Sequence, residues 1–179
     1  MSRPGRRAVF LDRDGVLNRA TVRDGHPYPP ATVADVVLIP GAADACRRLA
    51  DAGWLLVVVT NQPDIARGLM SQETLDAIHR TVMAALPVEE IAVCRHDNDD
   101  HCACRKPKPG LLLDLAARHN LDLRHSWMIG DQDRDILCGK SAGVRTVLMD
   151  RPYNARAGAD HLAADLLQAA DAILASDPL

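Results

Sequence analysis

The chain has 179 residues, 47% of them hydrophobic, and a formal net charge of −3. A chain of this length buries roughly 70% of the surface of its unfolded state, so we expect a single domain spanning residues 1–179. The negative charge excludes the strongly basic face of most nucleic-acid-binding proteins, and no apolar run approaches the roughly 18 residues of a membrane span. We therefore expect a monomer with neither a nucleic-acid nor a membrane partner.

The first apolar run, Ala8–Leu11, follows a few basic residues. It is too short for the apolar region of a signal peptide. We therefore expect a cytoplasmic protein, whose cysteines stay reduced.

Short apolar runs alternate along the chain with segments of helical periodicity. Strands are expected at Ala8–Asp12, Trp54–Thr60, Ile91–Cys94, Trp127–Ile129 and Arg145–Met149, with a short edge strand at Ala172–Leu174. Helices are expected at Gly41–Ala52, Ser71 to about Leu86, Gly110–Asn120, Asp133–Ala142 and Leu162–Ala170. This alternation predicts a three-layer α/β/α fold with a doubly wound, Rossmann-like parallel sheet.

Two segments lack this regular pattern. Asn18–Ile39 contains Pro27, Pro29 and Pro30, which block regular structure, so we expect it to be irregular. Arg95–Pro109 is polar and rich in Cys, His and Asp, so we expect a loop there as well. With 179 residues there is no room for a large inserted cap domain, so these two segments are expected to wall any pocket.

Acidic side chains follow the first predicted strand. Asp12 and Asp14 are two residues apart and are backed by Gly15, so both carboxylates can point to one side of an extended segment and share Mg²⁺. Ligands bind at the carboxyl ends of strands in open α/β sheets, which supports this interpretation. Taken alone, the pair is explained equally well by an Asx-type turn.

Polar residues also follow two later strands. Thr60 and Asn61 can donate hydrogen bonds to phosphate oxygens, although an ordinary turn would account for them in isolation. Asp131 leaves its strand next to Asp12 and can complete a metal site. We expect Asp133 to cap the next helix, and Asp135 to take either role.

Three cysteines and a histidine gather in a short loop, about residues 94–105. Cys94, His96, Cys102 and Cys104 match the ligand set of a structural zinc site. A disulfide is disfavoured by the expected compartment, and a redox pair by the lack of Cys-x-x-Cys. His101 is a candidate substitute ligand, whereas Cys46 and Cys138 fall inside predicted helices and are expected to be buried apolar residues.

A basic segment follows the last of these cysteines. Zinc would fix one end of Arg105–Gly110, and Pro107 and Pro109 would stiffen it. Such a segment places cations rigidly, which suits charge stabilisation at a phosphoryl group. Standing alone, it would be read as a solvated basic loop.

Together these motifs resemble those of the haloacid-dehalogenase-like (HAD) phosphatase superfamily. The first motif is FLDRDGVLN at Phe10–Asn18, and the others are Thr60-Asn61, Lys106 and Gly130-Asp131 with Asp135. The zinc loop leading into Cys104–Pro107 is similar to that of the heptose-bisphosphate and histidinol-phosphate phosphatases, and the resemblance covers about residues 8–149. The chain differs from this branch at Pro63-Asp64, where Ser-Gly is usual, and at His26–Pro30.

The resemblance implies a Mg²⁺-dependent phosphomonoesterase with structural Zn²⁺ and a small phosphorylated sugar as substrate. Asp12 would be the nucleophile and Asp14 the general acid and base. Mg²⁺ would be held by Asp12, Asp131 and the backbone carbonyl of Asp14. Thr60 and Lys106 would hold the phosphoryl oxygens.

Substrate contacts are implied for Asn61, Arg67 and Arg105. The sequence from Thr60 to Gly68 is closest to enzymes that remove the 7-phosphate of heptose 1,7-bisphosphate, with histidinol phosphate as the alternative substrate. Two other classes of protein share part of this pattern. A phospho-accepting receiver domain needs paired acidic residues at one strand end and a separate acceptor at another, and a zinc interaction module has no need of the catalytic set.

Overall fold

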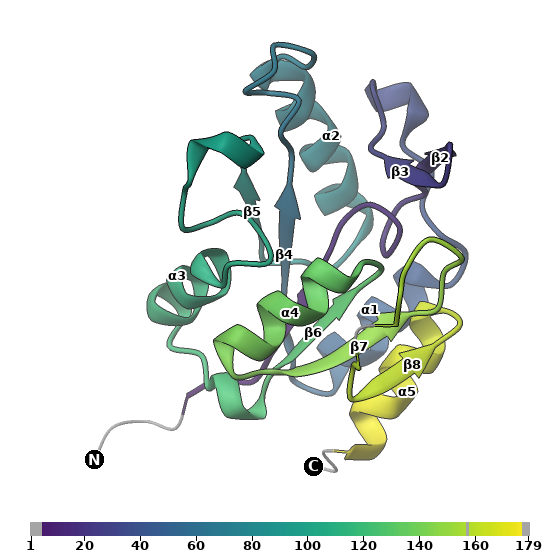
Figure 1. Cartoon of the computed structure of the whole chain (residues 1–179). Helices are drawn as coiled ribbons and strands as arrows, with labels where there is room; N and C mark the ends of the chain where they lie inside the picture. The colour runs from purple at the N-terminus through teal and green to yellow at the C-terminus, as the bar shows by residue number, and fades with distance from the viewer. Residues whose placement is uncertain (1–4, 157, 177–179) are drawn as a thin grey trace.

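The computed structural model describes residues 5–156 and 158–176. Its centre is a six-stranded parallel sheet with helices on both faces (Figure 1). The strands are β1 (Ala8–Leu11), β4 (Leu55–Asn61), β5 (Glu90–Cys94), β6 (Trp127–Gly130), β7 (Arg145–Met149) and β8 (His161–Ala163). The expected three-layer α/β/α fold is therefore confirmed.

The order of the strands places β1 at the centre of the sheet. From edge to edge the order is β5-β4-β1-β6-β7-β8, so the chain adds strands first on one side of β1 and then on the other. The direction of winding reverses between β1 and β6. In doubly wound sheets the crevice beside such a reversal, at the carboxyl ends of the strands, is where ligands bind.

The five α-helices of the described residues are divided between the two faces of the sheet (Figure 1). They are α1 (Ala42–Asp51), α2 (Gln72–Ala85), α3 (Gly110–His119), α4 (Asp133–Ala142) and α5 (Leu166–Ser176). Alternate residues of β1 point to opposite faces: Val9 and Leu11 pack in the same core as α1 and α5, whereas Ala8 and Phe10 pack in the core of α3 and α4. Burial of β1 on both faces explains why its sequence is a continuous apolar run.

The C-terminal part of the chain corrects two predictions. His161–Ala163, whose end overlaps the predicted helix Leu162–Ala170, forms strand β8 beside β7. Ala172–Leu174 is not an edge strand but lies within helix α5. Pairing with β7 decides the conformation of the short segment, which overrides its helical composition.

The segment Asn18–Ile39 is more regular than expected. It holds an antiparallel hairpin of β2 (Thr21–Arg23) and β3 (His26–Tyr28), in which Pro27 pairs with Val22. The turn is Asp24-Gly25, with φ of 50° and 75°. Positive φ at both central residues is what a two-residue hairpin turn needs, and Pro is tolerated in a two-stranded edge.

The remaining boundaries agree with expectation within a few residues. Ser71 caps α2 by accepting a hydrogen bond from the Thr74 N–H, as predicted. The hairpin and the loop of residues 95–109 rise above the carboxyl edge of the sheet, and no large cap is inserted in the described residues (Figure 1). No helix in residues 5–156 or 158–176 is long and apolar enough to cross a membrane.

Candidate active site

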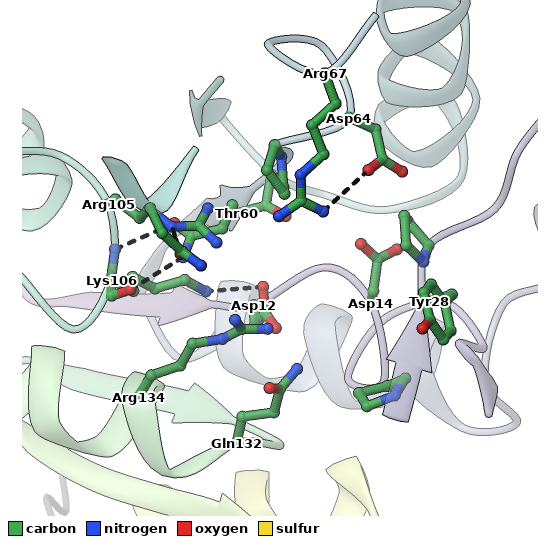
Figure 2. Close-up of a pocket in the computed structure, with 15 residues that line it drawn as sticks. Asp12, Asp14, Tyr28, Thr60, Asp64, Arg67, Arg105, Lys106, Gln132 and Arg134 are labelled. Carbon is green, nitrogen blue, oxygen red and sulfur yellow. Dashed lines mark hydrogen bonds and ion pairs between the residues drawn. The ribbon is translucent and has the colours of Figure 1, made fainter. Parts of the chain in front are cut away.

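A cavity of about 280 Å³ opens at the carboxyl ends of β1 and β4 (Figure 2). It receives side chains from both strand ends, from the β2–β3 hairpin, from the loop after β5 and from the start of α4. Its walls are Asp12, Asp14, Pro27, Tyr28, Pro29, Thr60, Asn61, Pro63, Asp64, Arg67, Asn98, Arg105, Lys106, Gln132 and Arg134. All the residues implied as catalytic or substrate-binding groups line it, including Asp12, Asp14, Thr60 and Lys106.

Lys106 lies at the floor of this cavity and is almost completely buried. Its Nζ is 2.9 Å from Asp12 Oδ1, 2.8 Å from Asp135 Oδ1 and 2.8 Å from the carbonyl oxygen of Val59. Burial by itself would lower the pKa of Lys106, but the two carboxylates hold that pKa above its ordinary value. The lysine is therefore a fixed ammonium that occupies one oxygen of Asp12.

Three buried carboxylates surround this ammonium. One oxygen from each of Asp12, Asp131 and Asp135 lies within 4.8 Å of the others. Burial raises the pKa of Asp12 to about 6 against the attraction of Lys106. Burial also raises the pKa of Asp131 to about 8, and repulsion from Asp12 and Asp135 adds to the rise.

This group fits a divalent cation. When all three carboxyl groups are ionised, they and the one ammonium leave two negative charges that the described side chains do not neutralise. Asp131 Oδ1 is buried, and within the described part of the chain no group hydrogen-bonds it, although Tyr153 donates its hydroxyl to Oδ2. Carboxylate oxygens are the ligands that Mg²⁺ prefers, and a cation here would satisfy both the charge and the orphan oxygen.

Two glycines make room for the carboxylates. A Cβ at Gly15, whose φ is +85°, would lie 2.0 Å from Asp131 Oδ2. A Cβ at Gly130 would lie 2.1 Å from Asp135 Cβ. Neither side chain could keep its place beside a larger residue, which explains why both motifs contain glycine.

Asp135 also caps helix α4, a role that the sequence suggested for Asp133. The N-cap residue is Gln132, whose backbone N–H donates to Asp135 Oδ2 at 3.1 Å. Asp133 instead accepts a hydrogen bond from the backbone N–H of Ala155. Asp133 therefore does not make the capping hydrogen bond, although it lies in the first turn of α4, where its charge favours the positive end of the helix.

The side chain of Asp14 is held apart from the three buried carboxylates. Arg13 donates to both of its oxygens, at 3.0 and 2.9 Å, and Asn18 and Gln62 donate one bond each. Among the described residues it is not in the group that could share a metal ion through side chains. The carboxylate nevertheless faces the cavity, as Figure 2 shows.

The side chain of Asn61 lines the cavity and also hydrogen-bonds the backbone of Lys106. Its Nδ2 donates to the carbonyl oxygen of Lys106, and its Oδ1 accepts from the N–H of Lys106, both at 3.1 Å. The amide therefore fixes the backbone of the loop that carries the lysine.

The two arginines expected at the substrate differ in their surroundings. Arg67 is paired with Asp97 through two hydrogen bonds of 2.6 and 2.7 Å, and Asp64 lies at 3.6 Å. The hydrogen bonds that Arg105 makes to described residues are to neutral groups, Asn98 Oδ1 at 2.9 Å and the carbonyl oxygen of His96 at 3.2 Å, and its attraction to Asp97 is weaker than that of Arg67. The positive charge of Arg105 is thus less compensated than that of Arg67.

Arg134 is a cavity residue that the sequence reasoning missed. It lies in the first turn of α4, its guanidinium points into the cavity near Asp12, and it pairs with no other described residue (Figure 2). The only available signal was an arginine three positions after Asp131, which by itself is an ordinary surface pattern.

The predicted zinc ligands come together beside the cavity. Zinc in a tetrahedral site, with Zn–S near 2.3 Å and Zn–N near 2.0 Å, requires S–S separations of about 3.8 Å and S–N separations of about 3.6 Å. Cys94 Sγ lies 3.7 Å from Cys102 Sγ and 3.6 Å from His96 Nδ1, while Cys104 Sγ lies 3.2 and 3.3 Å from Cys94 and His96. The four donors fit a zinc ion.

The other candidates for this site are resolved by the structure. His101 is outside the group of four among the described residues. Cys46 and Cys138 are fully buried in the two cores, as expected. The five cysteines are free thiols, which agrees with rejecting a disulfide.

The sequence is similar to known phosphatases. A model of the HAD-hydrolase-like family matches residues 103–172. The D-glycero-β-D-manno-heptose-1,7-bisphosphate 7-phosphatase of Pseudomonas putida is 38% identical over 146 residues, which cover 79% of this chain and 81% of the relative. The enzyme of the same name from Bordetella bronchiseptica is 40% identical over 140 residues, which cover 75% of each chain. The chain belongs to the HAD-like phosphatases.

Solved structures agree with this assignment. The D,D-heptose 1,7-bisphosphate phosphatase from B. bronchiseptica, complexed with magnesium and phosphate, matches with a TM-score of 0.83 at 33% identity, over 96% of this chain and 99% of that one. A putative HAD-like phosphatase from Mesorhizobium loti matches with a TM-score of 0.73 at 30% identity, over 96% and 88%. This HAD-like phosphatase is a phosphoric monoester hydrolase, which excludes the receiver-domain and interaction-module alternatives.

Proposed function

We propose that this phosphatase removes the 7-phosphate of D-glycero-β-D-manno-heptose 1,7-bisphosphate through an aspartyl-phosphate intermediate on Asp12. The observation that carries the proposal is the asymmetry of the Asp12 carboxylate. Lys106 occupies Oδ1 at 2.9 Å, and no described residue hydrogen-bonds Oδ2 at the edge of the cavity. The substrate and its anomer are proposed from the similar heptose-bisphosphate phosphatases of P. putida and B. bronchiseptica.

In the first step, the free oxygen of Asp12 attacks phosphorus. A new O–P bond forms while the P–O bond to C7 of the sugar breaks. Asp14 gives its proton to the departing alkoxide, which leaves as the 7-hydroxyl. Thr60 and Lys106 hold the phosphoryl oxygens.

In the second step, Asp14 acts as a base. It takes a proton from a water molecule, whose oxygen attacks the phosphorus of the aspartyl-phosphate. The bond between phosphorus and Asp12 breaks, inorganic phosphate leaves, and both carboxylates return to their starting state.

Two metals fit these residues. Asp12, Asp131 and the backbone carbonyl of Asp14 would hold Mg²⁺, which when bound offsets the repulsion between the nucleophile and the phosphate dianion. Asp135 joins the same carboxylate group and is an additional candidate for its inner or outer shell. Zn²⁺ on Cys94, His96, Cys102 and Cys104 would fix the loop that delivers Arg105 and Lys106.

The second phosphate of the substrate is assigned to Arg105 and Arg134. Both reach the cavity with no carboxylate partner among the described residues. Arg67 is a weaker candidate because Asp97 already takes its guanidinium in a two-bond pair. Asn61 is assigned to positioning Lys106 rather than to direct binding.

The wider setting follows from the same assignment. We take residues 1–179 to be one catalytic domain that acts as a monomer in the cytoplasm, where zinc-binding thiols stay reduced. A small phosphorylated sugar is the partner, and no nucleic-acid or membrane partner is invoked.

The test is release of phosphate by the purified protein with Mg²⁺. Heptose 1,7-bisphosphate, the matching 1- and 7-monophosphates and histidinol phosphate would be compared by kcat/KM, with Asp12→Asn as the matched inactive variant. We expect the bisphosphate to be the best substrate and Asp12→Asn to lose nearly all turnover while keeping its fold. A preference for histidinol phosphate would replace the proposed substrate, and wild-type release by Asp12→Asn would exclude the covalent mechanism.

A further inference from the structure

Gln62 is a buried amide that links two groups of the proposed reaction. It follows β4 directly, and its side chain is completely inaccessible. Its Nε2 lies 2.8 Å from Asp14 Oδ2 and 2.9 Å from Thr60 Oγ1, while its buried Oε1 has no hydrogen-bond partner in residues 5–156 or 158–176. Burying an amide oxygen without a hydrogen bond costs free energy, so the contacts of the NH₂ group must outweigh that cost.

The partners of Gln62 fix the direction of both hydrogen bonds. After the first step Asp14 has given up its proton, and its ionised carboxylate can only accept, so the NH₂ group of Gln62 faces Asp14 and its second hydrogen goes to Thr60. The Thr60 hydroxyl then accepts on one lone pair, and its own hydrogen is free, because no described residue accepts it. That hydrogen is left to donate into the cavity, where the phosphoryl oxygens would lie.

The same amide completes the set of donors around Asp14. Oδ1 accepts from Arg13 Nε and Asn18 Nδ2, and Oδ2 accepts from Arg13 Nη2 and Gln62 Nε2. The guanidinium of Arg13 is fully buried and cannot follow a moving carboxylate. Four donors from three residues therefore fix the plane of the ionised carboxylate, which is the form that takes a proton from water in the second step.

We infer that Gln62 is a positioning residue that couples Thr60 to Asp14. It turns the Thr60 hydroxyl hydrogen toward the phosphoryl group and holds the Asp14 carboxylate in the orientation for proton transfer. The inference rests on the roles proposed above for Asp14 and Thr60, and it adds a residue that contacts neither the metal group nor the substrate.

The test compares two leaving groups in Gln62→Met, which keeps the length of the side chain but has no donor. Hydrolysis of a sugar phosphate needs a proton for the alkoxide, whereas p-nitrophenolate leaves without one. We expect kcat to fall at least about 10-fold more on heptose 1,7-bisphosphate than on p-nitrophenyl phosphate, because general-acid catalysis contributes about 100-fold or more to the rate. The KM for the sugar should change less than about 3-fold, since Gln62 does not touch the substrate. Gln72→Met, on the exposed start of α2, is the matched control and should keep the wild-type ratio.

The comparison separates this inference from the proposed function. Both rates come from one sample, so any fraction of unfolded protein cancels in their ratio. Gln62→Asn, with a shorter side chain, provides a second variant. An equal loss on both substrates, or no loss, would reject the positioning role while the wild-type activity stands. Absence of Asp12-dependent activity in the wild-type protein would instead reject the proposed function.

Discussion

Lys106 and Arg134 are two cations of the same cavity with different surroundings. Lys106 is locked between Asp12 and Asp135, whereas Arg134 is partnered by no described side chain. A fixed ammonium can stabilise negative charge that develops in the transition state, and an unpaired guanidinium can bind an anion. The two residues are therefore expected to affect different kinetic constants.

Arg134→Ala should raise KM for the bisphosphate. Loss of one charge-assisted contact costs about 1.5–3 kcal/mol, or roughly a 10- to 100-fold increase in KM. The rate on the 7-monophosphate, which has no second phosphate, should change little and serves as the internal control. Arg67→Ala should have a smaller effect, because its charge is already taken by Asp97. A larger effect of Arg67→Ala would reverse the assignment of the two arginines.

Residues that follow strand ends could be predicted, and residues whose roles depend on packing could not. Asp12, Thr60 and Asp131 each follow a short apolar run, and parallel strands bring such positions to one edge. Arg134 has no comparable pattern, because its side-chain position depends on the direction of α4. Gln62 does follow a strand, but its burial and its contact with Asp14 depend on packing. The pairing of Asp14 with Arg13 could not be predicted either, since adjacent residues in a strand would point to opposite sides.

At the scale of elements, the loop after β5 is organised by its four metal-binding groups and by a tight return. A Cβ at Gly110 would lie 2.3 Å from the carbonyl oxygen of Ala103, so the loop closes onto the start of α3. Lys108 Nζ also donates to the carbonyl oxygen of Cys102 at 2.7 Å. The position of Lys106 is therefore set by contacts on both sides of it.

Cys102→Ser should displace the loop and lower turnover. The purified protein should contain about one zinc per chain, measured by elemental analysis, since a structural site contributes directly to folding. The variant should lose zinc and activity. Cys46→Ser, which removes a thiol outside the loop, should keep its zinc; protein purified without chelators and found free of zinc would contradict the site.

Helix α2 carries a titratable group that should make stability depend on pH. His79 is 9% exposed, and burial lowers its pKa to about 4, with a further lowering by Arg13. Between about pH 6.5 and 4 the unfolded chain binds more protons than the native state, so the free energy of unfolding falls as the pH falls. The loss attributable to this residue is about 3 kcal/mol at most.

The measurement is chemical denaturation at pH 7, 6, 5 and 4. His79→Gln should flatten the dependence in this window, whatever its effect at pH 7. His26→Gln, at an exposed position of the hairpin, should leave the dependence unchanged. Equal slopes in the wild type and His79→Gln would show that other groups carry the acid sensitivity.

The elements that sequence reasoning missed are short and depend on partners. Strand β8 has three residues and exists because β7 offers an open edge. The β2–β3 hairpin was hidden by its prolines, although Asp24-Gly25 is a strong turn signal. Long periodic segments such as α2 needed no such context, since periodicity and the Ser71 cap define them.

At the scale of the whole molecule, the buried carboxylates create a stability cost that a cation removes. Mg²⁺ at about 100 times its dissociation constant should stabilise the fold by about 2.7 kcal/mol. Asp131→Asn should be more stable than the wild type in magnesium-free buffer at pH 7, because the wild-type carboxyl, whose pKa is raised to about 8, must take up a proton on folding, whereas the amide is already neutral. The variant should no longer respond to Mg²⁺. Thermal unfolding with zinc retained measures both effects.

Asp133→Asn provides the control for this experiment. Asp133 lies outside the carboxylate group and binds the backbone of Ala155, so its variant should keep the stabilisation by Mg²⁺. A wild-type response in Asp131→Asn would place the cation elsewhere.

The two oxygens of Asp135 serve different parts of the molecule at once. Oδ2 accepts the Gln132 N–H at the start of α4, and Oδ1 pairs with Lys106, which belongs to the zinc loop. If the loop moves away and takes the lysine with it, Asp135 is left to turn toward solvent and the first amide of α4 loses its acceptor. Hydrogen–deuterium exchange at Gln132 therefore becomes a distant reporter of zinc, speeding up when the metal is removed although the amide touches neither the ion nor its ligands.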